Sequence, residues 1–503
     1  MRSHGQLWMG ILFTQGSLKG FSRFLSLIVT LVAISMATNT VPADGLSLLP
    51  LLQKAFPSVT SYTIEKTIIQ ANAKGYICAL DISSSSPGND TDDATRNNTP
   101  SRVFVKQVIA ADYVEAKKDW SDLRRTLCYA RTEVRYYQKF LPLLQARGLD
   151  EAPAVYLAQA NFDGWIPESE LANAQEFVTH DNHRTLPDAS ERGGTIILQC
   201  VEPTSHFQDS PLSTHNLQQC LAAVAALHAA AWQDKPLLTQ AADELSRASF
   251  HLSVRNPKEL ASLPETWERF CNNFDEPLQA AMMNEQDISM DEIRALGRQF
   301  AAAAVYISQQ VTPEPHDPYA TIIHGDYKAM NVFLPLHSDT DHAILVDYAS
   351  CGVGLGMSDV AMHLTHAVEP QMLLEQEESL VRYYWTSLQS ALEKRQGRSS
   401  GDSETNSIQY PWPVAWKHYR LAQLDYFRFV AARFWKSATP AAMDQKASNP
   451  NVVLANRSVP AAMIFVQRAH RFLKDLAKDD SELAKRIQTS FEPTAEVAKE
   501  DEL

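Results

Sequence analysis

Two short stretches of the sequence carry acids and an amide where such groups could do chemistry. Each is a run of branched apolar residues that ends in polar ones, which is typical of a buried strand and the turn after it. The first stretch supplies Asp326 and Asn331, and the second supplies Asp347. Phosphoryl transfer from a nucleotide needs one carboxylate that orients a hydroxyl, and an Asn and a second Asp that hold magnesium. Because magnesium takes oxygen ligands, neither Cys nor His is required.

The spacing of these residues favours a catalytic loop. Asp326 precedes Asn331 as the Asp precedes the Asn in the pattern H-R-D-L-x-x-x-N, and Asp347 falls where the aspartate of D-F-G would follow. Lys328, just after Asp326, could place positive charge beside the transferred phosphoryl group. Taken singly, each acid or amide could be a turn cap, since Asp and Asn bond to their own backbone. Their order and spacing together predict catalysis.

The residue before Asp326 is Gly325 instead of Arg, which gives H-G-D, and residues 354–361 contain G-x-x-x-x-D-x-A. Both motifs resemble the aminoglycoside phosphotransferase and choline-kinase-like superfamily, and most closely its ecdysteroid-kinase-like branch. The resemblance implies an α+β, bilobal protein-kinase-like fold with a small antiparallel β-rich N-lobe and a larger, mainly helical C-lobe. It also implies an enzyme that uses ATP and Mg²⁺ to phosphorylate a hydroxyl of a small molecule.

A lysine and a glutamate are the expected partners of the nucleotide phosphates. Lys106 lies in V-F-V-K, which resembles the V-A-I-K lysine that binds the α and β phosphates. The segment A-R-T-E-V-R-Y-Y at 130–137 resembles the F-x-x-E-x-x-F-Y segment of the branch, so Glu133 is the expected partner of Lys106. Glu115 is the alternative partner. A lysine on a solvated strand face is the alternative interpretation of Lys106.

Three further features follow from the resemblance. The strand predicted at 195–201 would lead to an interlobe hinge, where Gln199 and Val201 would meet the adenine. His228 lies on an apolar helix that resembles the L-x-x-L-H-A helix of the superfamily, and we expect it to form structural hydrogen bonds. Asp359 is expected to brace the catalytic loop instead of contacting substrate.

The bulk properties exclude several classes of protein. The 503 residues are 45% hydrophobic and 21% charged, as in ordinary globular proteins, and allow two or three packing units. A formal charge of −14 argues against a nucleic-acid binder, for which a basic face is expected. The six cysteines form no C-x-x-C pair, which argues against a zinc ribbon and a disulfide-dense scaffold. Pairing between some of them stays open.

The chain divides by composition into three parts after its N-terminal segment. We predict a small ATP-binding lobe at 46–200 with a flexible polar insertion at 83–101, a helical catalytic and substrate lobe at 201–480, and a polar tail at 481–503. Aromatic residues concentrate in and around the helices predicted near 370–394 and 413–436. Most should belong to the core, although relatives build the acceptor pocket from this region.

The N-terminal segment 1–37 reads as a secretory signal peptide. It has a basic flank, an apolar run at 24–34 and a small-x-small exit, and we expect cleavage after Ala37. The apolar run is short for a membrane span, which needs about 20 residues. An uncleaved membrane anchor is the alternative.

Two further signals fit the secretory pathway. Glycosylation sequons begin at Asn89, Asn97 and Asn456. The chain ends E-D-E-L, which is close to the K-D-E-L address for retention in the endoplasmic reticulum. We therefore expect a luminal protein.

Two other functions compete with a small-molecule kinase. A catalytically weak, kinase-like binding or scaffold protein would not need the intact set of acids. Phosphorylation of proteins is disfavoured by the missing Arg of H-G-D and by the absence of an A-P-E segment. The expected partners are thus ATP and a hydroxylated small molecule whose identity the sequence does not reveal.

Overall fold

The structure is a computed structural model that divides into two compact units, residues 1–65 with 79–99 and residues 66–78 with 100–503. It describes residues 47–70, 73–82, 99–115, 120–161, 192–283, 288–337, 342–398 and 410–490. The predicted signal peptide, the first two sequons and the C-terminal E-D-E-L lie outside these ranges.

The first unit contains helix α2 (Leu49–Ala55) and the outer parts of strands β1 (Val59–Gln70) and β2 (Ala73–Ile82). Pro50 stands in the first turn of α2, where its missing N–H leaves no helical bond unmade. The Tyr62 hydroxyl accepts a hydrogen bond from the Leu48 backbone N–H at 3.2 Å and so ties α2 to β1.

The sheet of the second unit has the strand order β1–β2–β3–β5–β4, to which β1 and β2 contribute their residues 66–70 and 73–78. Strand β3 (Arg102–Ile109) pairs antiparallel with β5 (Gly193–Gln199), and β5 pairs antiparallel with β4 (Val155–Asn161). The predicted small lobe is therefore present as an antiparallel sheet, and β4 is a strand that the sequence analysis did not predict.

Helix α5 (Trp120–Arg135) crosses this sheet and carries Glu133. Gly194 of β5 lies under this helix, where a Cβ would make ordinary contact with the side chains of Ala130 and Val134 at 3.6 Å. The helix continues as a π-helical turn η1 (Tyr136–Phe140) and as α6 (Leu141–Gln145).

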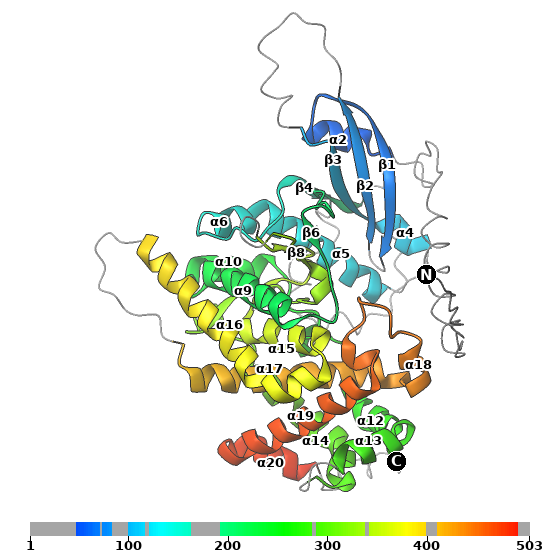
Figure 1. Cartoon of the computed structure of the whole chain (residues 1–503), viewed down its shortest axis with the longest axis vertical. Coiled ribbons are helices and arrows are strands. Elements are labelled where there is room, and N and C mark those ends of the chain that lie inside the picture. The colour runs from blue at the N-terminus through cyan, green and yellow to red at the C-terminus, as the bar shows by residue number, and fades with distance from the viewer. Residues whose placement is uncertain are drawn as a thin grey trace, which may run out of the picture. The chain divides into compact units, whose positions relative to one another are not determined.

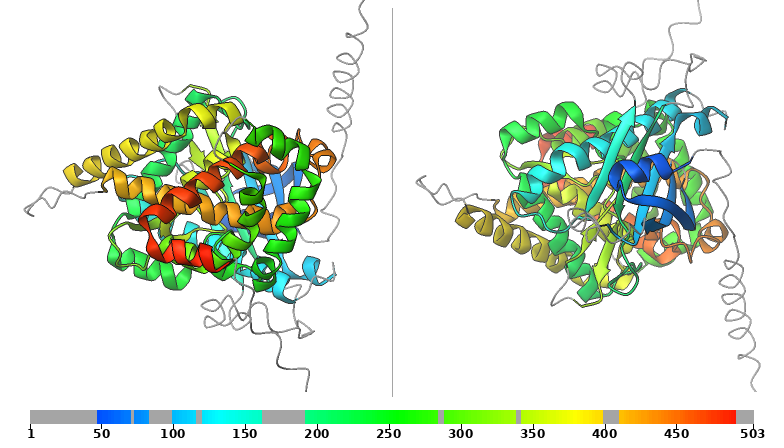
Figure 2. Two further views of the ribbon diagram at one scale, coloured as in Figure 1. Left: turned by 90° about the horizontal axis from the view of Figure 1, so that it is seen from below. Right: turned by 90° about the horizontal axis from the view of Figure 1, so that it is seen from above.

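The helical part packs long helices against one another (Figures 1 and 2). Helix α16 (Pro370–Arg398) runs along α9 (Thr214–Ala231), and α17 (Trp412–Phe429) packs against both α14 (Met290–Gln310) and α19 (Val459–Asp479). The other helices are α4 (Ala110–Glu115), α10 (Lys235–Glu244), α11 (Pro257–Ala261), α12 (Leu263–Asn273), α13 (Asp275–Met282), α18 (Pro440–Asp444) and α20 (Ser481–Thr489). The predicted polar tail thus begins as helix α20, because Asp480 caps it and Leu483 is buried.

Short strands frame the two motif stretches. Strand β7 (Ala320–Ile323) pairs with β10 (Gly352–Leu355), while β8 (Val332–Pro335) pairs with β9 (Ile344–Leu345) and with β6 (His206–Phe207). The 3₁₀ turn η4 (Ala329–Asn331) precedes β8, and helix α15 (Gly356–Ala367) follows β10. The H-G-D residues therefore lie between β7 and β8, and Asp347 follows β9.

Three further features of the described residues concern hydropathy, the cysteines and the third sequon. No helix in the described ranges is both long and apolar enough to cross a membrane. Cys220, Cys271 and Cys351 are buried free thiols. Asn456, which begins the third sequon, ends the 3₁₀ turn η7 (Leu454–Asn456) and has 6% of its surface exposed.

Candidate active site

The H-G-D turn needs a glycine at its centre. Gly325 has φ +76°, a left-handed conformation that side chains disfavour. A Cβ at this position would also lie 2.0 Å from the backbone oxygen of Ser350. Conformation and space both exclude an arginine here, which explains H-G-D in physical terms.

Asp359 holds this turn from the first turn of α15. Its carboxylate is fully buried and accepts hydrogen bonds from the backbone N–H of His324 at 2.7 Å and of Gly325 at 2.9 Å. His228 Nε2 lies 3.1 Å from the same carboxylate, and His228 Nδ1 lies 2.8 Å from the Tyr384 hydroxyl. The predicted bracing and structural roles of Asp359 and His228 are confirmed, and Tyr384 is a member of the network that sequence reasoning missed.

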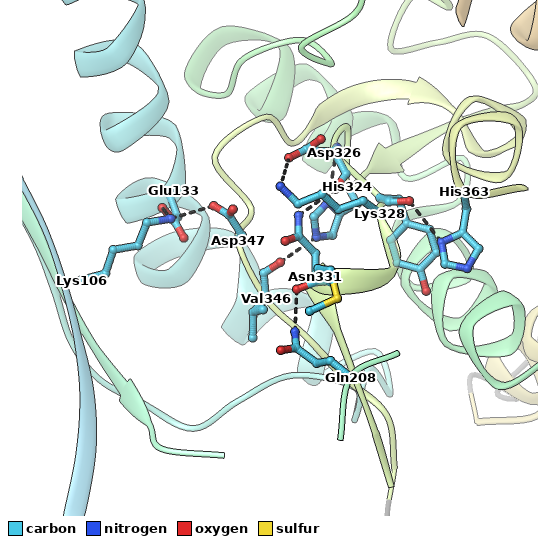
Figure 3. Close-up of polar contacts among 12 residues, drawn as sticks. Lys106, Glu133, Gln208, His324, Asp326, Lys328, Asn331, Val346, Asp347 and His363 are labelled. Atoms are coloured by element: carbon cyan, nitrogen blue, oxygen red, sulfur yellow. Dashed lines mark hydrogen bonds and ion pairs between the residues drawn. The ribbon is translucent and has the colours of Figure 1, made fainter. Parts of the chain in front are cut away.

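Asp326, Lys328 and Asn331 lie together in the catalytic loop (Figure 3). Lys328 Nζ is 3.3 Å from Asp326 Oδ2, and the Asp326 charge raises the pKa of Lys328 against the effect of its burial. The Asn331 side-chain amide donates to the Asp326 backbone oxygen at 2.8 Å. That bond uses the nitrogen of the amide and leaves its oxygen as a candidate metal ligand.

Lys106 lies between two carboxylates (Figure 3). Its Nζ is 2.7 Å from Glu133 Oε2 and 2.7 Å from Asp347 Oδ1. The predicted pairing of Lys106 with Glu133 is confirmed, although the sequence did not predict the contact with Asp347. Glu115 ends α4, and its side chain lies outside what the structure describes.

The charges of this cluster shift one another's pKa values. Burial favours a neutral lysine, but Asp347 and Glu133 outweigh it and raise the pKa of Lys106. Burial also favours a neutral Asp347, yet Lys106 and Lys328 hold the pKa of this carboxyl well below its usual range. Burial raises the pKa of Glu133 to about 7, because Lys106 offsets it only in part. One cation shared by two acids leaves the cluster with unbalanced negative charge.

The backbone holds Asp347 in an unusual conformation. Its φ is +70°, which a residue other than glycine adopts only when the surroundings impose it. The preceding Val346 accepts a hydrogen bond from His324 Nε2 at 2.9 Å, and its N–H donates to the Asn331 carbonyl at 3.0 Å. The loop that carries Asn331 therefore fixes the position of Asp347.

A stack of aromatic rings lies beside Asp347. Tyr348 stacks on Tyr136 of η1 with centroids 3.8 Å apart and lies 4.7 Å from the His324 ring, and Tyr137 meets Tyr348 edge-on at 5.9 Å. The hydroxyls of these three tyrosines are buried without a hydrogen-bond partner among the described residues. The sequence showed the Y-Y pair only as part of a motif match.

Gln208 and His363 support the loop from other sides (Figure 3). The Gln208 side-chain amide donates to the Met330 backbone oxygen, and His363 Nδ1 donates to the Tyr327 backbone oxygen at 3.1 Å. Sequence reasoning missed both. Their acceptors are backbone carbonyls, which every residue type carries, so no motif marks such contacts.

The two predicted hinge residues, Gln199 and Val201, differ in the hydrogen bonds that their backbone groups make. The Gln199 N–H donates to Ala154 O at 2.9 Å, and Gln199 Oε1 accepts from Ala154 N–H at 3.2 Å. No hydrogen bond within the described part of the chain engages the backbone of Val201. Val201 therefore fits the predicted role of offering backbone groups to an adenine base better than Gln199 does.

The candidate metal ligands are few. Among the described residues, no three or more His, Cys, Asp or Glu side chains gather into a metal site. Asn331 and Asp347 offer an amide and a carboxylate oxygen, and Mg²⁺ is usually held by one or two such groups together with phosphates and water. This donor set fits magnesium that arrives with a nucleotide.

The antiparallel sheet, the lysine–glutamate pair and the braced loop define a kinase-like protein. The model of the ecdysteroid kinase-like family matches residues 96–397, more than half of the chain, and the chain belongs to this family.

Solved structures similar to the chain include several kinases and a phosphotransferase. A microcompartment-associated aminopropanol kinase shares 11% identity, with 86% of this chain and 98% of that chain covered and a TM-score of 0.39. A choline kinase from Cryptosporidium parvum shares 10%, with 86% and 97% covered and a TM-score of 0.36. An ADP-bound aminoglycoside phosphotransferase shares 11%, with 84% and 99% covered and a TM-score of 0.29. No curated protein matches the sequence.

Proposed function

We propose that the protein is an ATP-dependent phosphotransferase that moves the γ-phosphate to a hydroxyl of a small molecule. The observation that carries this proposal is Lys106, bridged at 2.7 Å to both Glu133 and Asp347. A purely structural ion pair needs one carboxylate per lysine. A second carboxylate, partly exposed and held by a left-handed backbone, is instead ready to bind a cation.

Each residue then has a defined task. Asp326 accepts the proton of the acceptor hydroxyl, and Lys328 beside it supplies positive charge near the transferred group. Asn331 and Asp347 would hold Mg²⁺, which neutralises the phosphate charge when bound. Lys106 binds phosphate oxygens and is positioned by Glu133. Because phosphoryl transfer asks little covalent chemistry of the protein, position and charge supply most of the rate.

The side of Asp326 that faces α17 is aromatic. Burial raises the pKa of Tyr426, and the nearby Asp326 charge adds to this shift. Around Tyr426 stand Phe250 at 5.5 Å, Phe429 at 5.9 Å and Phe465 at 6.3 Å between ring centroids. All four side chains are buried, so this cluster belongs to the core beside Asp326.

Two measurements test the proposal. Mg·ATP should raise the melting temperature, since a ligand at 100 times its Kd stabilises the folded state by about 2.7 kcal/mol. A screen of hydroxylated small molecules for ATP consumption should then find an acceptor. Stabilisation without any turnover would favour the kinase-like scaffold. If Mg·ATP causes neither stabilisation nor turnover, the nucleotide site is refuted.

We also propose that residues 1–37 direct the chain into the secretory pathway, with the E-D-E-L ending as a retention signal. An endoglycosidase should then reduce the mass of the protein made in its own cell type. Replacing both Asn89 and Asn97 with Gln should abolish that change, whereas Asn456→Gln should not, because Asn456 is buried. An unglycosylated protein that retains residues 1–37 would contradict the localisation and leave the kinase proposal intact.

A further inference from the structure

Residues 245–251, here called the strap, connect α10 to the 3₁₀ turn η3 (Leu252–Val254) and touch the elements that carry the site. At one end of the strap, Ser246 Oγ accepts a hydrogen bond from the Thr132 hydroxyl of α5 at 3.0 Å. Thr132 directly precedes Glu133. The strap also presses on β10, since a Cβ on Gly352 would lie 1.7 Å from the Ser246 backbone oxygen.

The middle of the strap meets the catalytic loop backbone to backbone. Ser249 N–H donates to the Gly325 carbonyl at 3.4 Å, and a Cβ on Gly325 would lie 3.1 Å from Ala248 Cα. Gly325 directly precedes Asp326. A shift of the strap would therefore move the carbonyl next to the candidate base.

Two arginines hold successive carbonyls of the strap. Arg428 of α17 donates from Nη2 to the Phe250 backbone oxygen at 2.7 Å. Arg255 donates to the Ser249 backbone oxygen at 3.3 Å and is itself held by Glu259 at 2.9 and 2.6 Å. The strap is thus fixed at the point where it touches the loop.

Arg428 forms a buried ion pair with Asp425 that stability alone does not explain. Its side chain is 2% exposed and pairs with Asp425, which is 1% exposed, at 2.8 Å. Asp425 Oδ2 has no hydrogen-bond partner among the described residues, so the pair is incompletely satisfied. Apolar residues often replace such buried pairs without loss of stability. The task that an apolar residue could not perform is the bond to Phe250 O.

We propose that Arg428 is a positioning residue for the transfer, acting through the strap on Gly325 and so on the direction of Asp326. The inference rests on the proposed function for its catalytic consequence, while its structural part stands independently. The nucleotide contacts of Lys106 do not pass through Arg428. Loss of the Phe250 bond should therefore impair turnover far more than nucleotide binding.

The test compares two matched arginines. Arg428→Lys keeps a positive charge beside Asp425 but shortens the side chain that reaches Phe250 O. The control is Arg468→Lys, which makes the same change in the buried pair of Arg468 with Glu377. That pair lies outside the strap and far from Asp326 in sequence. Hydrogen exchange of the amides at 324–331 should accelerate in Arg428→Lys only. Hydrolysis of Mg·ATP should fall about 10-fold to 100-fold in that variant, as a small misplacement of a catalytic group predicts. Its affinity for Mg·ADP should stay within about two-fold of wild type.

A second variant separates position from stability. Asp425→Leu combined with Arg428→Met replaces the pair with apolar side chains, so the protein should still fold. It lacks the donor to Phe250 O, and its amides at 324–331 should exchange faster than those of wild type. Unchanged exchange in both Arg428 variants would overturn the proposal, as would an equal loss of hydrolysis and Mg·ADP affinity. A wild-type protein without turnover would refute the proposed function instead, and the exchange experiment would still decide the role of Arg428.

Discussion

Two buried ion clusters of this protein differ in how their charge is balanced. In the first, Lys106 faces two carboxylates, Glu133 and Asp347, at 2.7 Å each. The negative charge exceeds the positive, and the Asp347 side chain keeps 26% of its surface exposed. This cluster is electrostatically incomplete and open on one side.

The second cluster is closed. Glu377 of α16 accepts hydrogen bonds from Arg468 at 2.7 Å, from Arg471 at 3.0 Å and from the Tyr419 hydroxyl at 2.7 Å. The Arg468 and Glu377 side chains are 1% and 7% exposed. Here every carboxylate oxygen has donors, so the cluster joins α16, α17 and α19. The comparison teaches that partial exposure of an acid, more than burial of an ion pair, distinguishes the first cluster from the second.

The largest expected effect separates the two clusters by activity. Asp347→Asn and Asp326→Asn should each lower turnover by about 10³-fold or more, since they remove a metal ligand and the base, while the protein stays folded. Steady-state kinetics on folded protein measures this. Glu377→Gln is the matched control, and it should retain turnover but lose about 3–5 kcal/mol of unfolding free energy. Near-normal turnover by folded Asp326→Asn would contradict its assignment as base.

A smaller effect on activity is expected for the phosphate-binding pair. Lys106→Met should raise the KM for ATP and lower kcat, because a phosphate contact is lost. Glu133→Gln should act in the same direction by about 10-fold, since it releases Lys106 without removing it. Titration with ATP at saturating magnesium distinguishes the two. If Glu133→Gln impairs activity more than Lys106→Met does, Glu133 does not act mainly by positioning Lys106.

The pH dependence of stability should distinguish the open cluster. The pKa of Glu133 is about 7 in the folded protein and 4.5 normally. The folded state therefore holds a proton that the unfolded state has lost, and this stabilising contribution is full below 4.5 and disappears as pH rises through about 7. Urea unfolding should show Glu133→Gln gaining on wild type across this window by about 1–3 kcal/mol. A difference that does not change with pH would argue against the raised pKa.

The smallest expected effect comes from replacing a tyrosine with phenylalanine in each of the two clusters. Tyr348→Phe removes a buried hydroxyl without a partner, so unfolding free energy should change by less than about 1 kcal/mol or rise. Tyr419→Phe removes the donor to Glu377 and should cost about 1–3 kcal/mol. Denaturant unfolding measures both. Equal losses would mean that Tyr348 has found a partner, such as water.

Local sequence patterns predicted the parts of the site that depend on spacing. Lys106, predicted from V-F-V-K, lies on β3 and meets the predicted Glu133, because a strand followed by an amphipathic helix restricts where the two can pack. The bracing by Asp359 was also predictable, since the G-x-x-x-x-D motif places an acid at the start of a helix.

The long-range supports could not be predicted. Arg428 and Phe250 are 178 positions apart, and the acceptor is a backbone carbonyl that any residue would supply. Strand β4 is similarly weak as a sequence signal because its burial is only partial. The left-handed backbone of Asp347 leaves no trace in composition, since only the surrounding loop imposes it.

The chain after Asp347 returns at once into strand β10, which is paired residue by residue with β7 as far as Leu355. Main-chain pairing of this kind leaves the segment between Asp347 and Asp359 nothing to gain from ordering by a phosphate or a partner. We therefore expect the proposed kinase to need no phosphorylation of this segment before it acts.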